Sequence, residues 1–211
     1  MRLALLGATG PTGRELVGQG LLGGHAVVAL ARRPAELDDL RADGLEVVRG
    51  DARSEEPMAR LLEGADAVLS ALGPRRGESE ALPLIARRLV RAMSGAKVAR
   101  LVWLTRTAVH DPQDRPRPGH GMALSISRLY GRQILVDTVA AATEVRSSDR
   151  DWTLVRAGRL TSGPASGRAQ GAHLGLGARS RVSRADVAAF MLAQVGDETW
   201  LRRMPVVTVS S

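Results

Sequence analysis

The 211-residue chain is predicted to form an α/β fold, a doubly wound parallel sheet with helices on both faces. Short apolar runs typical of buried strands alternate with segments whose apolar residues recur at helical spacing. The first run also passes directly into a glycine-rich turn and a helix, an arrangement typical of parallel sheets that bind ligands at their carboxyl edge. A chain of this length can bury its core in one unit, so we expect residues 1–211 to form a single domain.

The predicted elements follow one another in regular order. Apolar runs predict strands at Leu3–Leu6, Ala26–Leu30, Leu45–Val48, Ala67–Ala71, Leu101–Leu104, Trp152–Val155 and Pro205–Val209. Because the last run begins with a proline, we expect it toward an edge of the sheet. Helical spacing predicts helices at Arg14–Leu22, Glu80–Met93, Arg128–Arg146 and Arg184–Val195. Ser183 followed by Asp186 is typical of a helix N-terminus.

Two segments resist assignment to helices or strands, residues 110–121 and residues 162–177, both rich in glycine, proline or charge. They follow the fifth and sixth strands, and therefore leave the carboxyl edge of the sheet, where ligands bind. Long loops in compact domains are often lids. We expect substrate-covering loops near residues 108–125 and 161–180, the alternative being surface loops without such a role.

The glycine-rich turn, residues 7–13, reads Gly-Ala-Thr-Gly-Pro-Thr-Gly. Glycines let a backbone approach a pyrophosphate closely, and a new helix offers unpaired amides and the positive end of its dipole. A proline suits the first helical position, where its missing N–H costs nothing. An ordinary strand-to-helix turn is the alternative, but the context favours dinucleotide binding. The predicted contacts are Gly7, Thr9, Gly10, Pro11, Thr12 and Gly13, of which Gly10 and Gly13 are expected to be required by backbone geometry.

The end of the second predicted strand indicates which dinucleotide binds. An NAD site places an acid there to bind the ribose 2′-hydroxyl. This chain has Arg32 and Arg33 instead, and no carboxylate before Glu36. A guanidinium pairs with a 2′-phosphate, which an acid would repel. The expected cofactor is therefore NADP(H), although the two arginines could merely end a strand in an arginine-rich chain.

Turns after the next two strands supply further candidate contacts. Asp51 and Ala52 follow the third strand, where the Asp51 carboxylate could accept a hydrogen bond from the adenine amino group. After the fourth strand, Ala71, Leu72 and Gly73 form a turn that could pass beneath the cofactor, and Arg75 could reach its phosphates. The same residues are also common in ordinary turns.

These motifs, in this order, resemble those of the atypical short-chain dehydrogenase/reductases. The resemblance covers nearly the whole chain and is carried by residues 7–13, Arg32, Gly50-Asp51, Asp66–Gly73, Asp151–Gly158 and Ser183–Ala188. More narrowly, the chain looks like the NAD(P)H-binding group that includes biliverdin reductase B/flavin reductase and regulators of the nitrogen-metabolite-repression type. The resemblance implies a Rossmann fold, NADP(H), and reduction of flavins, quinones or other conjugated carbonyls.

The chain departs from the usual acid–base machinery of short-chain dehydrogenases. Those enzymes use a Tyr-x-x-x-Lys pair in which lysine lowers the pKa of the tyrosine hydroxyl. Here the one tyrosine, Tyr130, is followed four residues later by Ile134. The candidate catalytic residues are therefore Thr105 and Arg106, at the end of the fifth strand, together with Tyr130. The alternative for Arg106 is contact with a cofactor phosphate, and the alternative for Tyr130 is a packing role.

Composition excludes several other functions. The net charge is +8, but the arginines are scattered and aromatic residues scarce, which argues against nucleic acid as the primary partner. Cysteine is absent and the four histidines lack metal-site spacing, so we expect no metal. No apolar stretch is long enough for a membrane span. We expect a cytoplasmic monomer or small homo-oligomer that takes a small aromatic or conjugated substrate.

Three functions remain open. The first is an NADPH-dependent oxidoreductase that transfers hydride to a flat conjugated acceptor by stacking it on the nicotinamide. The second is a non-catalytic NADP(H)-binding sensor, which the missing tyrosine–lysine pair allows. The third, a redox-neutral epimerase or dehydratase, is disfavoured because it would need a positioned acid–base pair.

Overall fold

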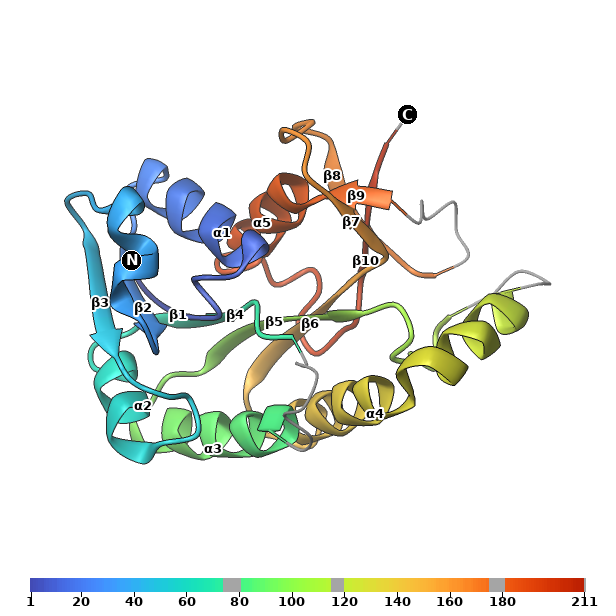
Figure 1. Cartoon of the computed structure of the whole chain (residues 1–211), viewed down its shortest axis with the longest axis horizontal. Helices are drawn as coiled ribbons and strands as arrows, with labels where there is room; N and C mark the ends of the chain where they lie inside the picture. Colours follow the sequence, from blue (N-terminus) through green and yellow to red (C-terminus); the bar gives the residue numbers. More distant parts are fainter. Residues whose placement is uncertain (74–80, 115–119, 175–180, 211) are drawn as a thin grey trace.

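The computed structural model describes residues 1–73, 81–114, 120–174 and 181–210, with the backbone alone for residues 120–131. Its main feature is an eight-stranded sheet flanked by helices (Figure 1). The parallel strands are β1 (Arg2–Leu6), β2 (Ala26–Ala31), β3 (Leu45–Arg49), β4 (Ala67–Ser70), β5 (Arg100–Arg106), β6 (Asp151–Ala157) and β10 (Val206–Val209). The eighth strand, β8 (Ala169–Ala172), pairs antiparallel with β10 at one edge.

Helices cover both faces of the sheet, as the sequence predicts. Figure 1 shows α1 (Pro11–Leu22) and α5 (Arg184–Ala193) on one face. The other face carries α2 (Glu55–Leu62), α3 (Ala81–Gly95) and α4 (His120–Arg146). Each side has its own apolar core, and the central strands contribute to both. The doubly wound Rossmann-like architecture is therefore confirmed.

The first strand illustrates why unbroken apolar runs predict this sheet. Leu3 and Leu5 of β1 pack into the core beneath α1 and α5, whereas Ala4 and Leu6 pack into the core beneath α2, α3 and α4. All four side chains are buried. A strand covered on both faces has no polar side to present, so it lacks the alternation of a half-exposed strand.

The strand order places a crevice at one end of β1. The order is β3-β2-β1-β4-β5-β6-β10-β8, so β2 and β3 lie on one side of β1 and β4 lies on the other. Leu5 of β1 pairs in register with Ala29 of β2 and with Leu69 of β4. Segments leaving the carboxyl ends of β1 and β4 therefore start side by side, at the point where such sheets bind ligands.

The structure differs from the sequence prediction in the segment after β6. Residues 162–177 are not entirely loop, because they contain β8, and β7 (Arg159–Thr161) and β9 (Arg181–Ser183) form a parallel pair around them. The β8 residues Ala-Gln-Gly-Ala have low strand propensity, and the strand forms because Val206–Val209 supplies a partner. As a result β10 is the penultimate strand, close to the edge as expected but covered by β8.

Helix boundaries also shift from those expected. The first helix begins at Pro11, which confirms the expected proline at the first helical position and extends the helical stretch predicted from Arg14. The α4 helix begins at His120, inside the segment left unassigned. Two short elements that the sequence analysis did not assign are α2 and the 3-10 helix η1 (Pro34–Leu40). The predicted start of α5 is confirmed, since Ser183 Oγ accepts a hydrogen bond from the Asp186 amide at 2.9 Å.

A backbone contact between two glycines joins β1 to α1. A Cβ atom added to Gly13 would lie 2.0 Å from the Gly7 carbonyl oxygen and 2.7 Å from the Ala8 Cα. Gly7 itself has φ +80°, and a Cβ there would lie 2.8 Å from the Ala71 carbonyl carbon. Two backbone segments thus pack at distances that admit no side chain. Gly10 is less constrained, because its Cβ would lie 3.3 Å from the Gly7 oxygen.

Replacing Gly13 with alanine is expected to lower the free energy of unfolding by about 3 kcal/mol, since the added methyl must push two backbone segments apart. Gly18→Ala is the matched control on the same helix, where an added Cβ meets nothing within 4 Å. That variant should gain up to about 1 kcal/mol from helix propensity. Urea unfolding followed by circular dichroism measures both, and equal stability of the two variants would contradict the contact.

Candidate cofactor site

A cleft of about 330 Å³ lies at the carboxyl edge of the sheet, where the turns after four strands meet. The turns after β1 and β4 form its floor with small residues, and the turns after β2 and β3 add charged residues. The start of α3 closes it with apolar side chains. Its wall consists of Leu6, Gly7, Thr9, Gly10, Pro11, Leu30, Ala31, Arg32, Gly50, Asp51, Ala52, Arg53, Ala71, Leu72, Gly73, Ala81, Leu82 and Ile85.

The glycine turn presents the start of α1 to this cleft. Gly10 is the residue preceding the helix, with φ −76° and ψ 161°, and as a glycine it offers no side-chain cap to the first amides. Those amides have no partner inside the helix itself. With the positive end of the helix dipole, they form a site suited to an anion such as a pyrophosphate.

Most residues that the sequence analysis assigned to the cofactor come together in this cleft. The ones that line it are Gly7, Thr9, Gly10, Pro11, Arg32, Asp51, Ala52, Ala71, Leu72 and Gly73. Among the residues that the structure describes, the predicted contacts Thr12, Gly13 and Arg33 are outside the cleft wall. Arg75 lies outside the described residues.

Sequence reasoning missed Arg53 and the apolar wall formed by Leu30, Leu82 and Ile85. The helical spacing of Leu82 and Ile85 indicates only that they lie on a buried helix face. Nothing in the sequence shows whether that face packs in the core or lines a pocket. Arg53 lies two residues after Asp51, a spacing that allows a local ion pair but does not by itself identify one.

Asp51 and Arg53 form a bidentate ion pair on the cleft wall. Arg53 Nε donates to Asp51 Oδ1 at 3.0 Å, and Arg53 Nη2 donates to Asp51 Oδ2 at 2.7 Å. The Arg53 amide also donates to Asp51 Oδ1 at 2.8 Å. These hydrogen bonds outweigh partial burial and, with the nearby positive charge of Arg32, lower the pKa of the Asp51 carboxyl to about 2. Asp51 is therefore an anion at every pH at which the protein would work.

The segment that carries Arg32 is anchored to the glycine turn by another arginine. Arg14, in the first turn of α1, donates from Nη1 to the Glu36 carbonyl oxygen at 2.8 Å. Its Nη2 pairs with Asp39. Both partners lie on η1, which directly follows Arg32 and Arg33. One side chain thus fixes the position of the charged β2 turn relative to the helix N-terminus.

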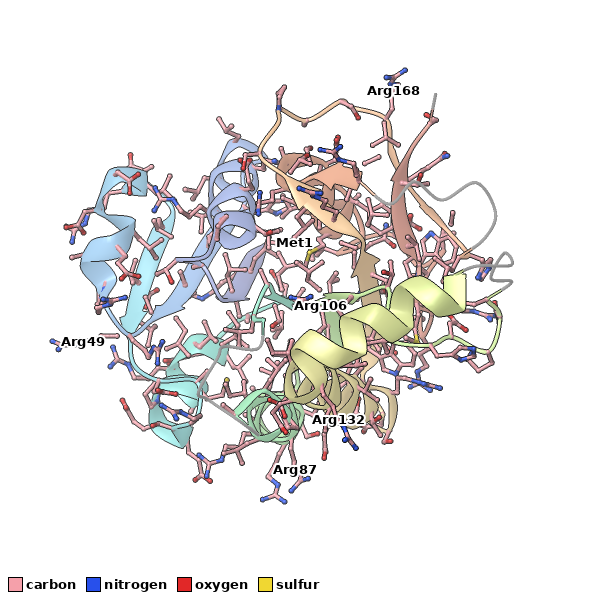
Figure 2. All side chains as sticks on the ribbon, turned by 45° about the vertical axis from the view of Figure 1, so that its right-hand side comes forward. Met1, Arg49, Arg87, Arg106, Arg132 and Arg168 are labelled. Atoms are coloured by element: carbon pink, nitrogen blue, oxygen red, sulfur yellow. The ribbon has the colours of Figure 1, made fainter. Side chains whose placement is uncertain are left out.

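The three candidate catalytic residues are described to different extents. Thr105 and Arg106 end β5, the strand next to β4, so they stand at the same carboxyl edge as the cleft. Thr105 is 6 % exposed, and none of the described residues hydrogen-bonds to its Oγ1. Arg106 is exposed and is labelled in Figure 2. Tyr130 lies within α4, in the part described by its backbone.

A buried ion pair stabilises the carboxyl edge beside Thr105. Arg156 of β6 is completely buried and pairs in register with Thr105. Its Nη1 and Nη2 donate to the two carboxylate oxygens of Asp114 at 2.5 and 2.7 Å, and its Nε donates to the Met204 carbonyl oxygen at 2.8 Å. Asp114 Oδ1 also accepts from the Leu174 amide at 3.3 Å. Asp114 thus joins the two segments predicted to cover a substrate, and its own carboxylate is held by the Arg156 guanidinium.

A second anchor holds the segment between β7 and β8. Asp186, 3 % exposed on α5, accepts hydrogen bonds at Oδ1 from the Ser166 amide at 2.7 Å and from Ser166 Oγ at 2.9 Å. Its Oδ2 accepts from Ser183 Oγ at 2.8 Å. The same carboxylate that marks the start of α5 in the sequence therefore also fixes a loop twenty residues away.

A family model of NAD(P)H-binding proteins matches residues 7–198. Two curated proteins match about half of the chain. One is the photosystem II assembly factor Ycf39 of Synechocystis sp., 30% identical over 109 residues, which are 50% of this chain and 33% of that protein. The other is (4-alkanoyl-5-oxo-2,5-dihydrofuran-3-yl)methyl phosphate reductase of Streptomyces griseus, 37% identical over 111 residues, which are 52% of this chain and 36% of that protein. The matched stretch thus spans about a third of each relative.

Among solved structures, ChuY, an anaerobilin reductase from Escherichia coli O157:H7, superposes with a TM-score of 0.82. It is 20% identical in sequence, and the match covers 100% of this chain and 98% of that one. The superposition establishes a shared fold. In the part of the chain that the structure describes, every helix is too short or too polar to cross a membrane.

Asp114→Asn is expected to lower the free energy of unfolding by about 3 kcal/mol at pH 7, since it removes the bidentate carboxylate of the buried Arg156 cation and leaves only that of Asp111, at 4.0 Å. Burial alone would raise the pKa of the Asp114 carboxyl, but the hydrogen bonds from Arg156 and from the Asp111 and Leu174 amides hold that pKa below its usual value.

Because the folded-state pKa is lowered, this stabilisation is complete above the unfolded-state pKa of about 3.9 and is lost as the pH falls through the folded-state value. Urea unfolding of both proteins from pH 7 down to pH 3 should show the difference shrinking at the acid end. Asp149→Asn, which removes an exposed carboxylate paired with Arg150, serves as the control and should change stability little. A difference between wild type and Asp114→Asn that is independent of pH would contradict the assignment.

Proposed function

The chain belongs to the NAD(P)H-binding family, and on that premise we propose that it is an NADPH-dependent oxidoreductase of the atypical short-chain dehydrogenase/reductase type. The proposed reaction moves a hydride from the cofactor to a flat conjugated acceptor: a flavin, a quinone or a conjugated carbonyl. The observation that carries this proposal is the cleft in which an uncapped helix N-terminus and Arg32 face the same space. The reductase names of one curated relative and one structural neighbour support the same class of reaction.

The chain's own residues fit a bound dinucleotide. The first amides of α1 would bind the pyrophosphate, and Gly10, on the cleft wall directly before the helix, has no side chain to obstruct the approach. Ala52, Leu82 and Ile85 provide an apolar surface of the kind that suits an adenine ring. When bound, the nicotinamide supplies the hydride, so the protein's task is to bind, orient and exclude competing reactions.

The preference for NADPH is argued from the β2 turn. Arg32 lines the cleft directly after β2, the position from which an NAD-binding protein would offer an acid to the ribose 2′-hydroxyl. A charge-assisted hydrogen bond to a phosphate contributes about 1.5–3 kcal/mol, whereas a hydroxyl gains much less from the same cation. Arg14 supports this role by holding η1 against the helix N-terminus.

We place the acceptor near the end of β5. There Thr105 Oγ1 can donate a hydrogen bond to an acceptor oxygen or nitrogen, and Arg106 can stabilise the negative charge that hydride transfer creates. The acceptor gains a hydride and a proton, and solvent can supply the proton when no acid is positioned. The Arg156–Asp114 pair favours a rigid floor for this region, because it joins the segment after β5 to the segment after β8.

A non-catalytic role as an NADP(H)-binding sensor is the second candidate. The absence of a Tyr-x-x-x-Lys pair supports it, and one curated relative is named as an assembly factor. NADPH oxidation with FMN, a simple quinone and a panel of carbonyl compounds separates the two functions. Turnover supports the reductase, whereas tight NADPH binding without turnover on any acceptor supports the sensor.

Arg32→Ala is expected to weaken NADPH binding by about tenfold or more while changing NADH binding little, because only NADPH carries the 2′-phosphate. Isothermal titration calorimetry with both cofactors measures this. Arg49→Ala is the matched control, since Arg49 ends β3 nearby but points away from the molecule (Figure 2). Equal wild-type affinity for the two cofactors, unchanged in Arg32→Ala, would contradict the preference.

For the reductase, Tyr130→Phe is expected to lower kcat less than about tenfold, well under the 10²–10⁴ lost with a true general acid. Arg106→Ala should cost more, because charge on the reduced acceptor loses its stabilising cation. Steady-state kinetics with an accepted flavin or quinone measures both, with Arg168→Ala as a control at an exposed arginine on another part of the surface (Figure 2). A thousandfold loss in Tyr130→Phe beside normal activity of Arg106→Ala would assign the proton donor to the tyrosine.

A further inference from the structure

We infer that Arg53, positioned by Asp51, is the second cation that recognises the 2′-phosphate of NADPH, and that Arg33 is not. This inference rests on the proposed NADPH site and names a specificity-determining residue within it. It concerns the part of the cleft formed by the turn after β3, which is next to β2 in the sheet.

The position of Arg53 is the first support. Arg53 and Arg32 both line the cleft, and they come from the turns after β3 and β2, which are adjacent parallel strands. Asp51 lies on the same cleft wall as both arginines and is hydrogen-bonded to Arg53. A phosphate in this part of the cleft would therefore meet two cations from two strands.

The orientation of Arg53 is the second support. Its Nε and Nη2 make two parallel hydrogen bonds to Asp51, and its own amide binds the same carboxylate. A bidentate pair of this kind fixes the plane of the guanidinium and lowers the entropy lost when an anion binds it. Because a guanidinium is a planar fork, it can pair with a carboxylate along one edge and a phosphate along another.

Arg33 lacks both properties. Its side chain is 75 % exposed and pairs with Glu36 one turn along η1. Among the described residues it is not part of the cleft wall. Its position next to Arg32 in the sequence made it a candidate, but consecutive residues at a strand end point in different directions.

The role of Asp51 follows from its charge. An ionised acid in an NADPH site would repel the 2′-phosphate unless a cation lies between them. Arg53 covers both carboxylate oxygens, which makes Asp51 a positioning residue instead of an acceptor for the adenine amino group. Loss of Arg53 would therefore act twice, by removing a phosphate contact and by uncovering a negative charge.

Calorimetric titration of the full chain with NADPH and with NADH tests this inference, using Arg53→Ala, Arg33→Ala and Asp51→Asn/Arg53→Ala. Arg53→Ala should weaken NADPH binding by about tenfold or more and change NADH binding less than threefold. The double variant removes the uncovered acid, yet it should remain several-fold weaker than wild type for NADPH because the phosphate contact is still missing. Arg49→Ala should bind both cofactors like wild type.

Three results would overturn the inference. One is an equal loss of NADPH and NADH affinity in Arg53→Ala, which would indicate a general effect on the cleft. Another is full recovery of NADPH affinity in the double variant, which would assign the whole loss to the uncovered Asp51 charge. The third is a larger selective loss in Arg33→Ala than in Arg53→Ala. Wild-type protein that binds neither cofactor would instead overturn the proposed function itself, and this inference with it.

Discussion

The close approach of Gly13 to the Gly7 carbonyl is the constraint from which the carboxyl edge of the sheet is built. It brings α1 against the end of β1 at a distance that no side chain permits, and it leaves the first amides of the helix facing the crevice beside β4. The turn after β4 also packs closely against Gly7. The segments that leave β1 and β4, the two strands beside the crevice, therefore meet in one close backbone contact. Side-chain interactions then position the charged turns after β2 and β3 around this backbone contact.

Several arginine side chains hold segments of this fold together. Arg14 binds a carbonyl of η1, Arg100 binds the Gln194 and Asp151 carbonyls, and Arg156 binds the Met204 and Val109 carbonyls. Each guanidinium joins segments far apart in the sequence through oxygens that would otherwise need other donors. An excess of arginine can therefore reflect internal cross-links and need not indicate a nucleic-acid partner.

Much of the architecture could be predicted from local patterns, because unbroken apolar runs and a glycine turn each have one dominant structural meaning. The strand β8 could not, since Ala169-Gln170-Gly171-Ala172 forms a strand only through pairing with residues more than thirty positions away. In the cleft, lining residues such as Gly7 and Gly10 could be predicted from the glycine turn, whereas the sequence did not show that Arg53 and not Arg33 lines the cleft. Which of two arginines faces a cleft depends on their carboxylate partners, Glu36 and Asp51, and hence on tertiary structure.

The antiparallel strand β8 has a consequence for self-association. Its partner β10 has the sequence Val-Val-Thr-Val. Without β8, the backbone amides and carbonyls on that side of β10 would be unpaired, and this β-branched strand would be an exposed edge to which another chain could add. The short strand β8 pairs with these groups of β10. Because β8 consists of small and polar residues, it is itself a poor template for another chain. Gly171 enables this cover, because Trp200 and Phe190 lie where its Cβ would be. The few residues of β8 thus protect the folded chain against edge-to-edge aggregation.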